Sequence, residues 1–513
     1  MSTELRRPAA ISILLVLLLL IGCTSGEEAP GKTKSPAKPT VEVGMLAQGE
    51  PMKLDVLEYN IEYGGDASTD AVIQKLNADI VGVLESYNRL PEIAKNAGYP
   101  YYDVGLQILS KYPTLEPSGA DGLYSFIEVQ PGYVVAFFNT HLDYVKYGTS
   151  MYLRGVPLDE VIASENEVRT NSMKILIPDM QALADQGYPV FLTGDFNEAS
   201  SLDYARQTVG TRKGITEAIP WPVSETLLGI GMRDTYREIH PDPVAVPGLT
   251  HGNPDFHKGG FGDRIDYVYA GGPSSTIDSK LVGEKGGPDV DLGFDPWTSD
   301  HRAVLSRFQV TPVALPTTVS LASRMLTQGD KLHVLYNAPG HEETSIAIVP
   351  AGGDASAAIE KTTTGESGKT SFDTAKLKPD GYDIVMLDAA GTELARNSFW
   401  IRSVEANVTM STGKDTYTVG EPIDVSWDNG PANRWDWIGV YKAPATDMHD
   451  YLLWGYVGGH ESGALPPQVF GQMTLGEDSQ GSPWPLPPGR YRIYYLLTDK
   501  YKPAGYVDIK VVE

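Results

Sequence analysis

Polar side chains that can bind a metal ion or move a proton interrupt or border apolar, β-rich runs at six separate places in the chain. They are Asn60, Glu85, His141, the Gly194-Asp195-Phe196-Asn197 segment, Asp266 and the Ser299-Asp300-His301 segment. Each is ordinary alone, because such residues commonly end strands and begin turns. Asn60, Glu85 and Asp300 together offer only oxygen donors, which suit a hard divalent cation that keeps several waters. These residue types therefore predict Mg²⁺ or Mn²⁺ as the cofactor rather than zinc.

The runs that precede these residues are expected to be strands of an α/β domain. Residues 52–61 and 79–84 are β-rich, and the apolar residues between them recur at helical spacing over 68–78. Further strands are expected over 133–140, 188–194, 263–269 and 303–308. Strand, helix and strand with a polar residue at each strand end is an α/β layout, so we expect the site at the strand ends.

A longer helix is expected between the strands over 133–140 and 188–194. Ser164 and Glu167 have the capping-box spacing that opens a helix, and Gly187 is a residue type that ends one. Pro178 lies inside this range and is expected to bend the helix.

In this order the motifs resemble the endonuclease/exonuclease/phosphatase superfamily, which includes deoxyribonuclease I, abasic-site endonucleases, inositol polyphosphate phosphatases and bacterial sphingomyelinases. The resemblance covers residues 52–308 and rests on the GDFN segment at 194–197 together with the SDH segment at 299–301. Residues 105–113 are similar to the strand that this family places before its second half, with Lys111 where an arginine is commoner. The resemblance implies a four-layer α/β sandwich, in which helices flank two facing mixed β-sheets. It also implies hydrolysis of a phosphoester with one or two Mg²⁺ ions.

The other residues of the set take complementary roles in such a reaction. Asp195 is expected to orient or deprotonate the attacking water, and the Asn197 amide to hold the phosphate. His141 and His301 supply the hydrogen-bond donors that the transition state needs. Asp266 is expected behind His301, where a carboxylate fixes the tautomer and charge of the imidazole.

Basic residues outside this set are weaker candidates for gripping a substrate phosphate. Lys111, Arg169 and Arg264 are the candidates for substrate binding, and Arg154 and Lys258 have the same chemistry. A surface or ion-paired role is an equal alternative for each of them.

A glycine-rich loop holds a second group of possible metal ligands. His251, Asp255 and His257 lie within it and could bind a further metal ion. Solvated loop residues are the favoured alternative, because connecting loops lie at the surface.

The first residues form a targeting segment, 1–23. Arg6 and Arg7 precede an apolar run over 11–21, about half the roughly 20 residues that a membrane-spanning helix needs. The Leu-Ile-Gly-Cys segment that ends at Cys23 resembles the bacterial lipobox, which implies diacylation of this single cysteine. Several acyl chains hold a protein stably on a membrane, so we expect a lipid anchor outside the cytoplasm, at the outer membrane or cell surface. The alternative is an ordinary secretory signal in which Cys23 is incidental.

Composition divides the rest of the chain into four segments. They are a polar, disordered tether over 24–51, the catalytic domain over 52–309, and two immunoglobulin-like β-sandwiches over 310–405 and 406–513. An internal repeat supports two sandwiches: residues 329–336, 346–349 and 378–382 resemble residues 420–427, 438–441 and 487–491.

The second copy is rich in tryptophan, with Trp427, Trp435, Trp437, Trp454 and Trp484. These residues could form an aromatic platform for a sugar or peptide, although core packing is the more common use of such residues. The stretch over 435–441 resembles an immunoglobulin-like strand of the SKICH type. We expect the two modules to position the catalytic domain or to bind a surface ligand.

The charge of the chain favours some classes of phosphoester substrate over others. The 513 residues carry a net charge of −25, which repels a polyanion at long range, and the catalytic half has no cluster of Lys and Arg. We therefore expect an extracellular phosphodiester or phosphomonoester as substrate, and nucleic acid is disfavoured. The alternatives are an extracellular nuclease of the same fold and a non-catalytic surface-binding or adhesion protein on a degenerate scaffold. One cysteine excludes an intramolecular disulfide.

Overall fold

The computed structural model describes residues 46–513, except 88, 213, 254–260, 404–406, 432, 434–435, 459–468, 478 and 498–500. Among the described residues, no helix is long and apolar enough to cross a membrane. Several predictions of the sequence lie outside the described residues: the leader with Cys23, most of the tether, Asp255, His257, Lys258 and Trp435.

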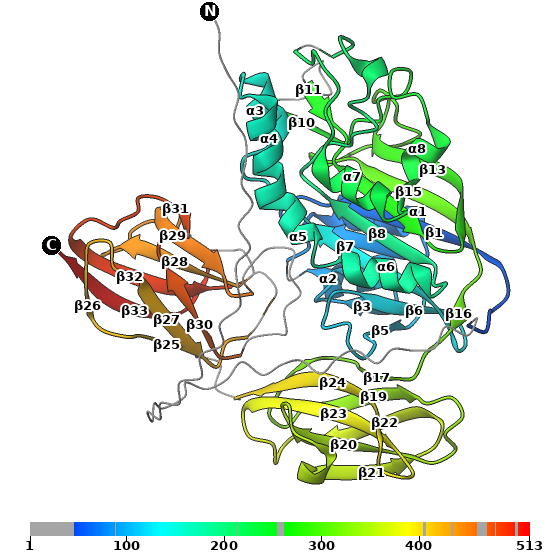
Figure 1. Cartoon of the computed structure of the whole chain (residues 1–513), viewed down its shortest axis with the longest axis vertical. Helices are drawn as coiled ribbons and strands as arrows, with labels where there is room; N and C mark the ends of the chain where they lie inside the picture. Colours follow the sequence, from blue (N-terminus) through cyan, green and yellow to red (C-terminus); the bar gives the residue numbers. More distant parts are fainter. Residues whose placement is uncertain are drawn as a thin grey trace, which may run out of the picture. The chain divides into compact units, whose positions relative to one another are not determined.

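Two β-sheets pack face to face in the first half of the described chain (Figure 1). The first sheet has the order β14 (Leu292–Phe294), β13 (Ser274–Glu284), β15 (Ala303–Val310), β1 (Met52–Asn60), β2 (Ile80–Leu84), β4 (Ile108–Ser110) and β3 (Tyr101–Asp103). The second has the order β5 (Thr114–Leu115), β6 (Ser125–Gln130), β7 (Tyr133–His141), β8 (Val190–Asp195), β12 (Asp266–Gly271) and β9 (Arg233–Asp234), and β16 (Val313–Ala314) pairs with β7. Both sheets mix parallel and antiparallel pairs, as expected.

Helices cover the outer faces of both sheets. α1 (Ala67–Leu76) and α2 (Leu90–Ala97) share an apolar cluster with β1 and β2, and α6 (Ile177–Asp185) and α7 (Pro222–Gly229) share one with β7 and β8 (Figure 1). A third cluster, with Val56, Phe137 and Phe308, fills the space between the sheets. The expected four-layer α/β sandwich is therefore confirmed. The short elements are α3 (Gly148–Leu153), α4 (Leu158–Glu165), α5 (Asn171–Met173), α8 (Thr235–Ile239) and the hairpin of β10 (His251–Asn253) and β11 (Phe261–Asp263).

The β1–α1–β2 unit forms where the sequence predicts it. Asp66 caps α1, because its carboxylate accepts hydrogen bonds from the backbone N–H groups of Ser68 and Thr69. Asn77 ends the helix with a left-handed φ of 48°. β1 and β2 then lie parallel, with Asn60 opposite Leu84, so Asn60 and Glu85 reach the same edge of the sheet.

The long helix expected after residue 164 is instead a broken series. Helix α4 already begins at Leu158, so Ser164 lies inside it and the capping-box prediction is wrong. A π-helical segment follows over Asn166–Thr170 and sets the Arg169 guanidinium against the Glu165 carboxylate. Pro178 lies in the first turn of α6, where its missing N–H costs nothing, and so it starts a helix instead of bending one.

The end of the predicted tether lies against the folded domain. The Gly49 N–H donates to the Pro312 carbonyl, the Ala314 N–H donates to the Ala47 carbonyl, and Gln48 forms a bridge with Val313. These backbone bonds extend the edge of the second sheet, which composition alone does not reveal.

The rest of the described chain forms two all-β sandwiches. In the first, the sheet β17 (Thr318–Leu321), β19 (Lys331–Asn337), β22 (Ser367–Asp373) faces the sheet β18 (Met325–Thr327), β24 (Glu393–Arg402), β23 (Asp380–Asp388), β20 (Thr344–Pro350), β21 (Glu360–Thr364) across one apolar core. In the second, the sheet β25 (Thr409–Thr412), β27 (Ile423–Asp428), β30 (Gly471–Leu475) faces the sheet β26 (Thr416–Thr418), β33 (Pro503–Val512), β32 (Gly489–Leu496), β28 (Trp437–Lys442), β29 (Tyr451–Tyr456), β31 (Gln480–Gly481).

The internal repeat of the sequence corresponds to equivalent strands in these sandwiches. β19 and β27, β20 and β28, and β23 and β32 carry the repeated segments and occupy matching positions in the sheets. In each copy a tyrosine hydroxyl donates to the carbonyl four residues earlier, Tyr382 to Lys378 and Tyr491 to Pro487. Such a tyrosine corner recurs in immunoglobulin-like sandwiches. Trp427 and Trp437 are buried, which favours core packing over an exposed platform for both.

The two sheets of the catalytic half approach closely at Gly82 of β2. The Asn139 amide of β7 bridges them by donating to the carbonyls of Val83 and Leu106, and its oxygen accepts from the Thr193 hydroxyl of β8. A Cβ atom at Gly82 would overlap the Thr193 hydroxyl and lie 2.6 Å from Asn139 Oδ1.

We therefore expect Gly82→Ala to lower the free energy of unfolding by about 1–3 kcal/mol, the usual cost of overpacking a core. Urea unfolding of the full chain measures this. Gly229→Ala is the matched control, because no atom lies within 4 Å of a Cβ built there. Equal stability of the two variants would contradict the close approach.

Candidate active site

The six polar segments meet where the two sheets present matching strand ends. In the second sheet β7 and β8 are parallel with His141 opposite Asp195, and β12 is antiparallel with Asp266 opposite Asp195. In the first sheet, Asn60 and Glu85 leave the ends of the parallel strands β1 and β2.

Asn60 joins the two sheets at this edge. Its buried amide donates to Glu85 Oε1 at 3.3 Å and to Asp195 Oδ2 at 3.1 Å. Its Oδ1 atom accepts from the Glu62 N–H at 3.1 Å. Glu85 has a φ of 58°, an unusual value for a side chain of this size, and its Oε2 atom accepts from the Tyr63 N–H at 2.9 Å. Local geometry therefore turns the Glu85 carboxylate toward Asn60.

His301 lies between two buried carboxylates. Its Nδ1 atom is 3.0 Å from both oxygens of Asp266, and its Nε2 atom is 3.6 Å from Asp195 Oδ2. Burial alone would lower the pKa of His301, but Asp266 and Asp195 outweigh burial and raise it to about 10. The imidazole is therefore a cation at neutral pH, and Asp266 has the position behind it that the sequence predicts.

Asp195 is ionised in spite of its burial. Burial would raise its pKa, but His301 and His141 favour the charged form and hold the pKa below the ordinary range. The Asn197 N–H donates to its Oδ1 atom at 2.8 Å, and Asn197 itself adopts a left-handed φ of 47°. The turn after β8 thus fixes one carboxylate oxygen and leaves the other facing the two imidazoles.

Asn197 and His141 are also brought together. The Asn197 amide lies 3.2 Å from His141 Nε2 and donates to the Leu142 carbonyl at 3.0 Å. His141 Nε2 lies 3.5 Å from Asp195 Oδ2, so all three residues border the same point.

Asp300, the third predicted metal ligand, lies beside two imidazoles. The contacts of its carboxylate are with His301 Nε2, 3.8 Å from Oδ1, and with His251 Nε2, 3.7 Å from Oδ2. Burial would raise its pKa, but the His251 contact and the His301 charge lower it. The structure therefore pairs Asn60 with Glu85 and places Asp300 beside imidazoles, a division that residue types alone do not reveal.

Two hydroxyl residues without a predicted role position this cluster. Ser299 donates to the Asn60 carbonyl at 2.7 Å and accepts from the His301 N–H, which ties the SDH segment to the end of β1. Thr250 Oγ1 accepts from the N–H groups of Ile265 and Asp266 and so supports the start of β12. Ser299 belongs to the predicted SDH segment, whereas sequence reasoning missed Thr250, which nothing in the sequence marks.

Glu58 is a further buried acid beneath the site. Its carboxylate is fully buried on β1, and neither oxygen has a hydrogen-bond partner in the described chain. Burial raises the pKa of Glu58 well above the ordinary range, and the charges of Asp266 and Asp195 raise it further. Glu58 lies two residues after Val56 and four after Leu54 in a predicted strand, so nothing in the sequence distinguished it from an ordinary strand residue.

The donor set and its charge fit a divalent cation. Asn60 and Glu85 each carry an oxygen donor of the kind that hard cations prefer, and the two side chains are in contact through the Asn60 amide nitrogen. Five carboxyl groups gather at this edge: Glu58, Glu85, Asp195, Asp266 and Asp300. No lysine or arginine of the described chain forms an ion pair with any of them. A bound dication would offset this excess of negative charge.

The three basic residues predicted to bind substrate lie elsewhere. Lys111 donates to the Asn77 carbonyl and pairs with Asp79 at 3.3 Å. Arg169 and Arg264 are fully buried. The ion-paired alternative therefore describes all three.

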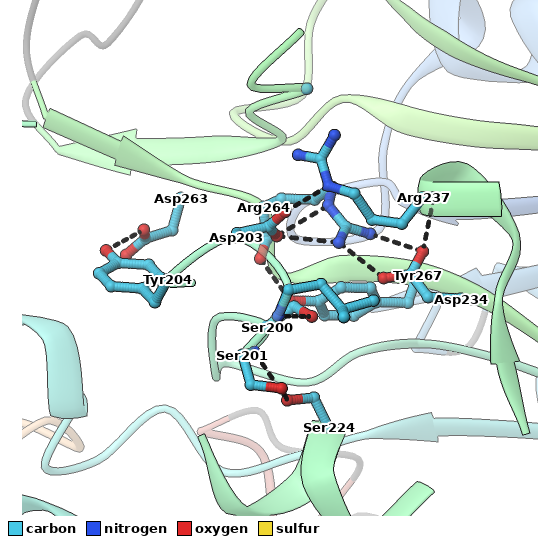
Figure 2. Close-up of polar contacts among 12 residues, drawn as sticks. Ser200, Ser201, Asp203, Tyr204, Ser224, Asp234, Arg237, Asp263, Arg264 and Tyr267 are labelled. Carbon is cyan, nitrogen blue, oxygen red and sulfur yellow. Dashed lines mark hydrogen bonds and ion pairs between the residues drawn. The ribbon is translucent and has the colours of Figure 1, made fainter. Parts of the chain in front are cut away.

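Arg264 anchors the segment that leads into β12. Figure 2 shows its guanidinium between the carboxylates of Asp203 and Asp234, with Arg237 also directed at Asp203. Arg264 Nη2 lies 2.6 Å from Asp234 Oδ2, and its Nε lies 3.0 Å from Asp203 Oδ2. This network lies between β11 and β12, where the sequence predicted one continuous strand.

Because removing one partner of a buried ion pair typically costs 3–5 kcal/mol, we expect Arg264→Ala to lower the free energy of unfolding by about that amount. Urea unfolding measures the change. The exposed Arg154→Ala serves as control. A stable Arg264→Ala protein with a raised KM alone would instead restore the substrate-binding role.

Arg169 belongs to a second buried cluster, next to the GDFN segment. It donates to Glu165 Oε2 at 2.7 Å, and Glu165 is hydrogen-bonded to Glu198. Burial and the Glu165 charge raise the pKa of Glu198 well above its ordinary range, so Glu198 is a neutral acid in the folded protein. Its Oε1 atom accepts from the Val223 N–H at 2.7 Å.

A folded-state pKa above the unfolded value means that folding stability falls as pH rises from the unfolded pKa toward the folded one. Glu198→Gln keeps a neutral donor and acceptor and removes this titration. We expect the variant to gain stability relative to the natural protein at pH 8 and to differ less at pH 4, as measured by urea unfolding at both values. A difference that does not change with pH would contradict the neutral state of Glu198.

Comparison with known proteins agrees with this geometry. The sequence profile of the Endonuclease/Exonuclease/phosphatase family matches residues 57–301. Uncharacterized protein F14F9.5 of Caenorhabditis elegans is 29% identical over 240 residues, which cover 42% of this chain and 75% of that protein.

Solved structures also align with the chain. An endonuclease/exonuclease/phosphatase from Beutenbergia cavernae is 16% identical with a TM-score of 0.33, over 68% of this chain and 99% of that one. A mannosyl-6-phosphatase from Bacteroides thetaiotaomicron is 14% identical with a TM-score of 0.29, over 50% and 99%. An AP endonuclease from Archaeoglobus fulgidus is 13% identical with a TM-score of 0.34, over 49% and 98%. Residues 57–301 are therefore similar to the Endonuclease/Exonuclease/phosphatase family, whose members are hydrolases that act on phosphoesters.

Proposed function

We propose that this protein is a metal-dependent phosphoesterase anchored outside the cytoplasm by a lipid on Cys23. One observation carries the catalytic part: the His301 ring lies between the buried carboxylates of Asp195 and Asp266 at the common edge of two sheets. This arrangement holds a positive donor and a negative acceptor side by side, which hydrolysis of a phosphoester by water requires.

The charge states of the trio assign its roles. His301 keeps its proton at neutral pH and donates a hydrogen bond to a phosphate oxygen, where negative charge develops. Asp195 is ionised and accepts a hydrogen bond from the attacking water. Because a carboxylate of low pKa is a weak base, Asp195 orients the water in preference to deprotonating it.

Neighbouring groups complete the phosphate pocket. Asn197 and His141 lie on the far side of Asp195 from Asp266 and supply an amide and a ring nitrogen to the same space. Asp266 does not touch the substrate in this scheme. It holds the His301 ring and stabilises its charge through Nδ1.

Mg²⁺ or Mn²⁺ would be held by Asn60 and Glu85, and Asp300 is the proposed third oxygen ligand. When bound, the ion neutralises a phosphate oxygen and the leaving group. Asp195 would still orient the water, and His301 would still supply the proton for the hydrogen bond to the phosphate.

A small phosphodiester or phosphomonoester suits this site better than a nucleic acid. Family nucleases track a polyanion with basic side chains, whereas the net charge here is −25 and the nearest predicted cations are buried or engaged elsewhere. A lipid anchor at Cys23 would bring the site to extracellular lipid head groups or to phosphoesters scavenged as nutrients.

The decisive measurement is release of product from an aryl phosphodiester and the matching monoester. We expect hydrolysis with Mg²⁺ or Mn²⁺, loss of hydrolysis in EDTA, and recovery when the ion is restored. An adhesion protein on a dead scaffold would release no product with either ion. Product release from plasmid DNA, sphingomyelin and inositol phosphates, measured in the same way, then shows which substrate class the protein hydrolyses.

Single substitutions test the roles. Asp195→Asn and His301→Gln should each lower kcat by about 10²–10⁴-fold while the folded protein remains stable, because general acid and base groups contribute on that order. His449→Ala, in the second sandwich, is the control. Full turnover by either site variant would refute the role assigned to that residue.

A further inference from the structure

We propose that His251, Asp300 and His301 form a second cation site, built from nitrogen and oxygen donors, that takes a borderline transition metal of the Zn²⁺ type. This site adjoins the proposed Mg²⁺ ligands and shares Asp300 with them. The binding claim stands on the geometry of these three residues, and only its consequence for turnover rests on the proposed function.

The three side chains converge on one point. His251 Nε2 lies 3.7 Å from Asp300 Oδ2, His301 Nε2 lies 3.8 Å from Asp300 Oδ1, and one ligand atom of each residue lies within 4.8 Å of the others. With metal–ligand bonds of about 2.1 Å, ligand atoms on one ion lie roughly 3–4 Å apart, so only small side-chain shifts are needed. The two rings stack with centroids 4.4 Å apart, and the Nε2 atom of each ring is the one that faces Asp300.

The backbone fixes His251 in this position. The carbonyl of the preceding residue, Thr250, accepts a hydrogen bond from the Arg302 N–H. The Thr250 N–H donates to the Asp263 carbonyl. His251 itself pairs with Asp263 in the β10–β11 hairpin. The backbones of Thr250 and Arg302 are therefore hydrogen-bonded to each other. Because His251 follows Thr250 and His301 precedes Arg302, the two histidines lie side by side.

The environment of His301 resembles that of a metal ligand. A histidine that binds a metal through one nitrogen usually donates its other N–H to a carboxylate, and Asp266 accepts from His301 Nδ1 at 3.0 Å. This contact leaves Nε2 as the atom that faces Asp300.

Three carboxylates surround the His301 ring. Those of Asp266, Asp195 and Asp300 lie 3.0, 3.6 and 3.8 Å from its nitrogen atoms, and their negative charge attracts a cation to this position.

The donor set distinguishes this site from that of Asn60 and Glu85. Imidazole nitrogens suit zinc and its neighbours, whereas carboxylate and amide oxygens suit Mg²⁺. An ion held by His251 would also occupy Asp300 and the Nε2 atom of His301, so we expect it to inhibit a reaction that depends on both residues.

Equilibrium dialysis of the full chain against micromolar Zn²⁺ in millimolar Mg²⁺ tests the site, with bound metal counted by mass spectrometry. We expect the natural protein to bind one more zinc ion than His251→Ala and His251→Gln, and zinc affinity at this site to fall at least 10-fold in both variants. His449→Ala is the matched control, because His449 and Asp447 form an exposed pair of the same chemistry, 2.8 Å apart, and no third ligand joins them among the described residues. Matching thermal melts would show that the variants fold.

The inference is overturned if the His251 variants bind zinc as the natural protein does, or if His449→Ala loses the same ion. Inhibition of hydrolysis by zinc is a separate measurement. Zinc should inhibit Mg²⁺-supported hydrolysis by the natural protein at concentrations at least 10-fold below those needed for His251→Gln, and equal inhibition of both would overturn the inhibitory role. Absence of hydrolysis with Mg²⁺ would refute the proposed function, while the dialysis result would still decide the zinc site.

Discussion

A buried imidazolium between two carboxylates is the interaction on which the rest of the site depends. Asp195 and Asp266 are cross-strand partners on β8 and β12, so their side chains enter the same face of the sheet. Removing two such charges from water costs several kcal/mol for each ion, and His301 offsets this cost because it contacts both. A one-residue slip between β8 and β12 would turn the acids to opposite faces, so the strand register is part of the chemistry.

Buried ion pairs elsewhere in the domain explain why the site has so little positive charge. Arg264 neutralises Asp203 and Asp234 under the start of β12, and Arg169 neutralises Glu165 beside the GDFN turn. These arginines hold in place the segments that carry Asp266 and Asn197. Both are fully buried and ion-paired, so the structure shows them stabilising the scaffold.

Strand ends were predictable from the sequence because period-two apolar runs and the polar residues after them are local signals. Asn60, Glu85, His141 and Asp195 were placed at the correct strand ends in this way, whereas Asp266 was expected inside a strand and is the first residue of β12. The environment of Arg264 and the partners of Asp300 could not be foreseen, because both depend on contacts between residues distant in the chain. Thr250 and Glu58 were missed for the same reason, since a threonine in a loop and a glutamate in a strand carry no local mark of burial.

The excess of carboxylates also links cation binding to the fold. Asn60 and Glu85 come from the first sheet, whereas Asp195 and Asp266 come from the second, and the Asn60 amide donates to Asp195 across this junction. An ion that binds only the folded arrangement stabilises it, by about 2.7 kcal/mol at a concentration 100 times its dissociation constant. It also relieves the repulsion that a phosphate dianion would otherwise meet at this edge. The same ion would therefore strengthen the junction of the two sheets and admit the substrate, which makes substrate affinity depend on how firmly the sheets hold the cation.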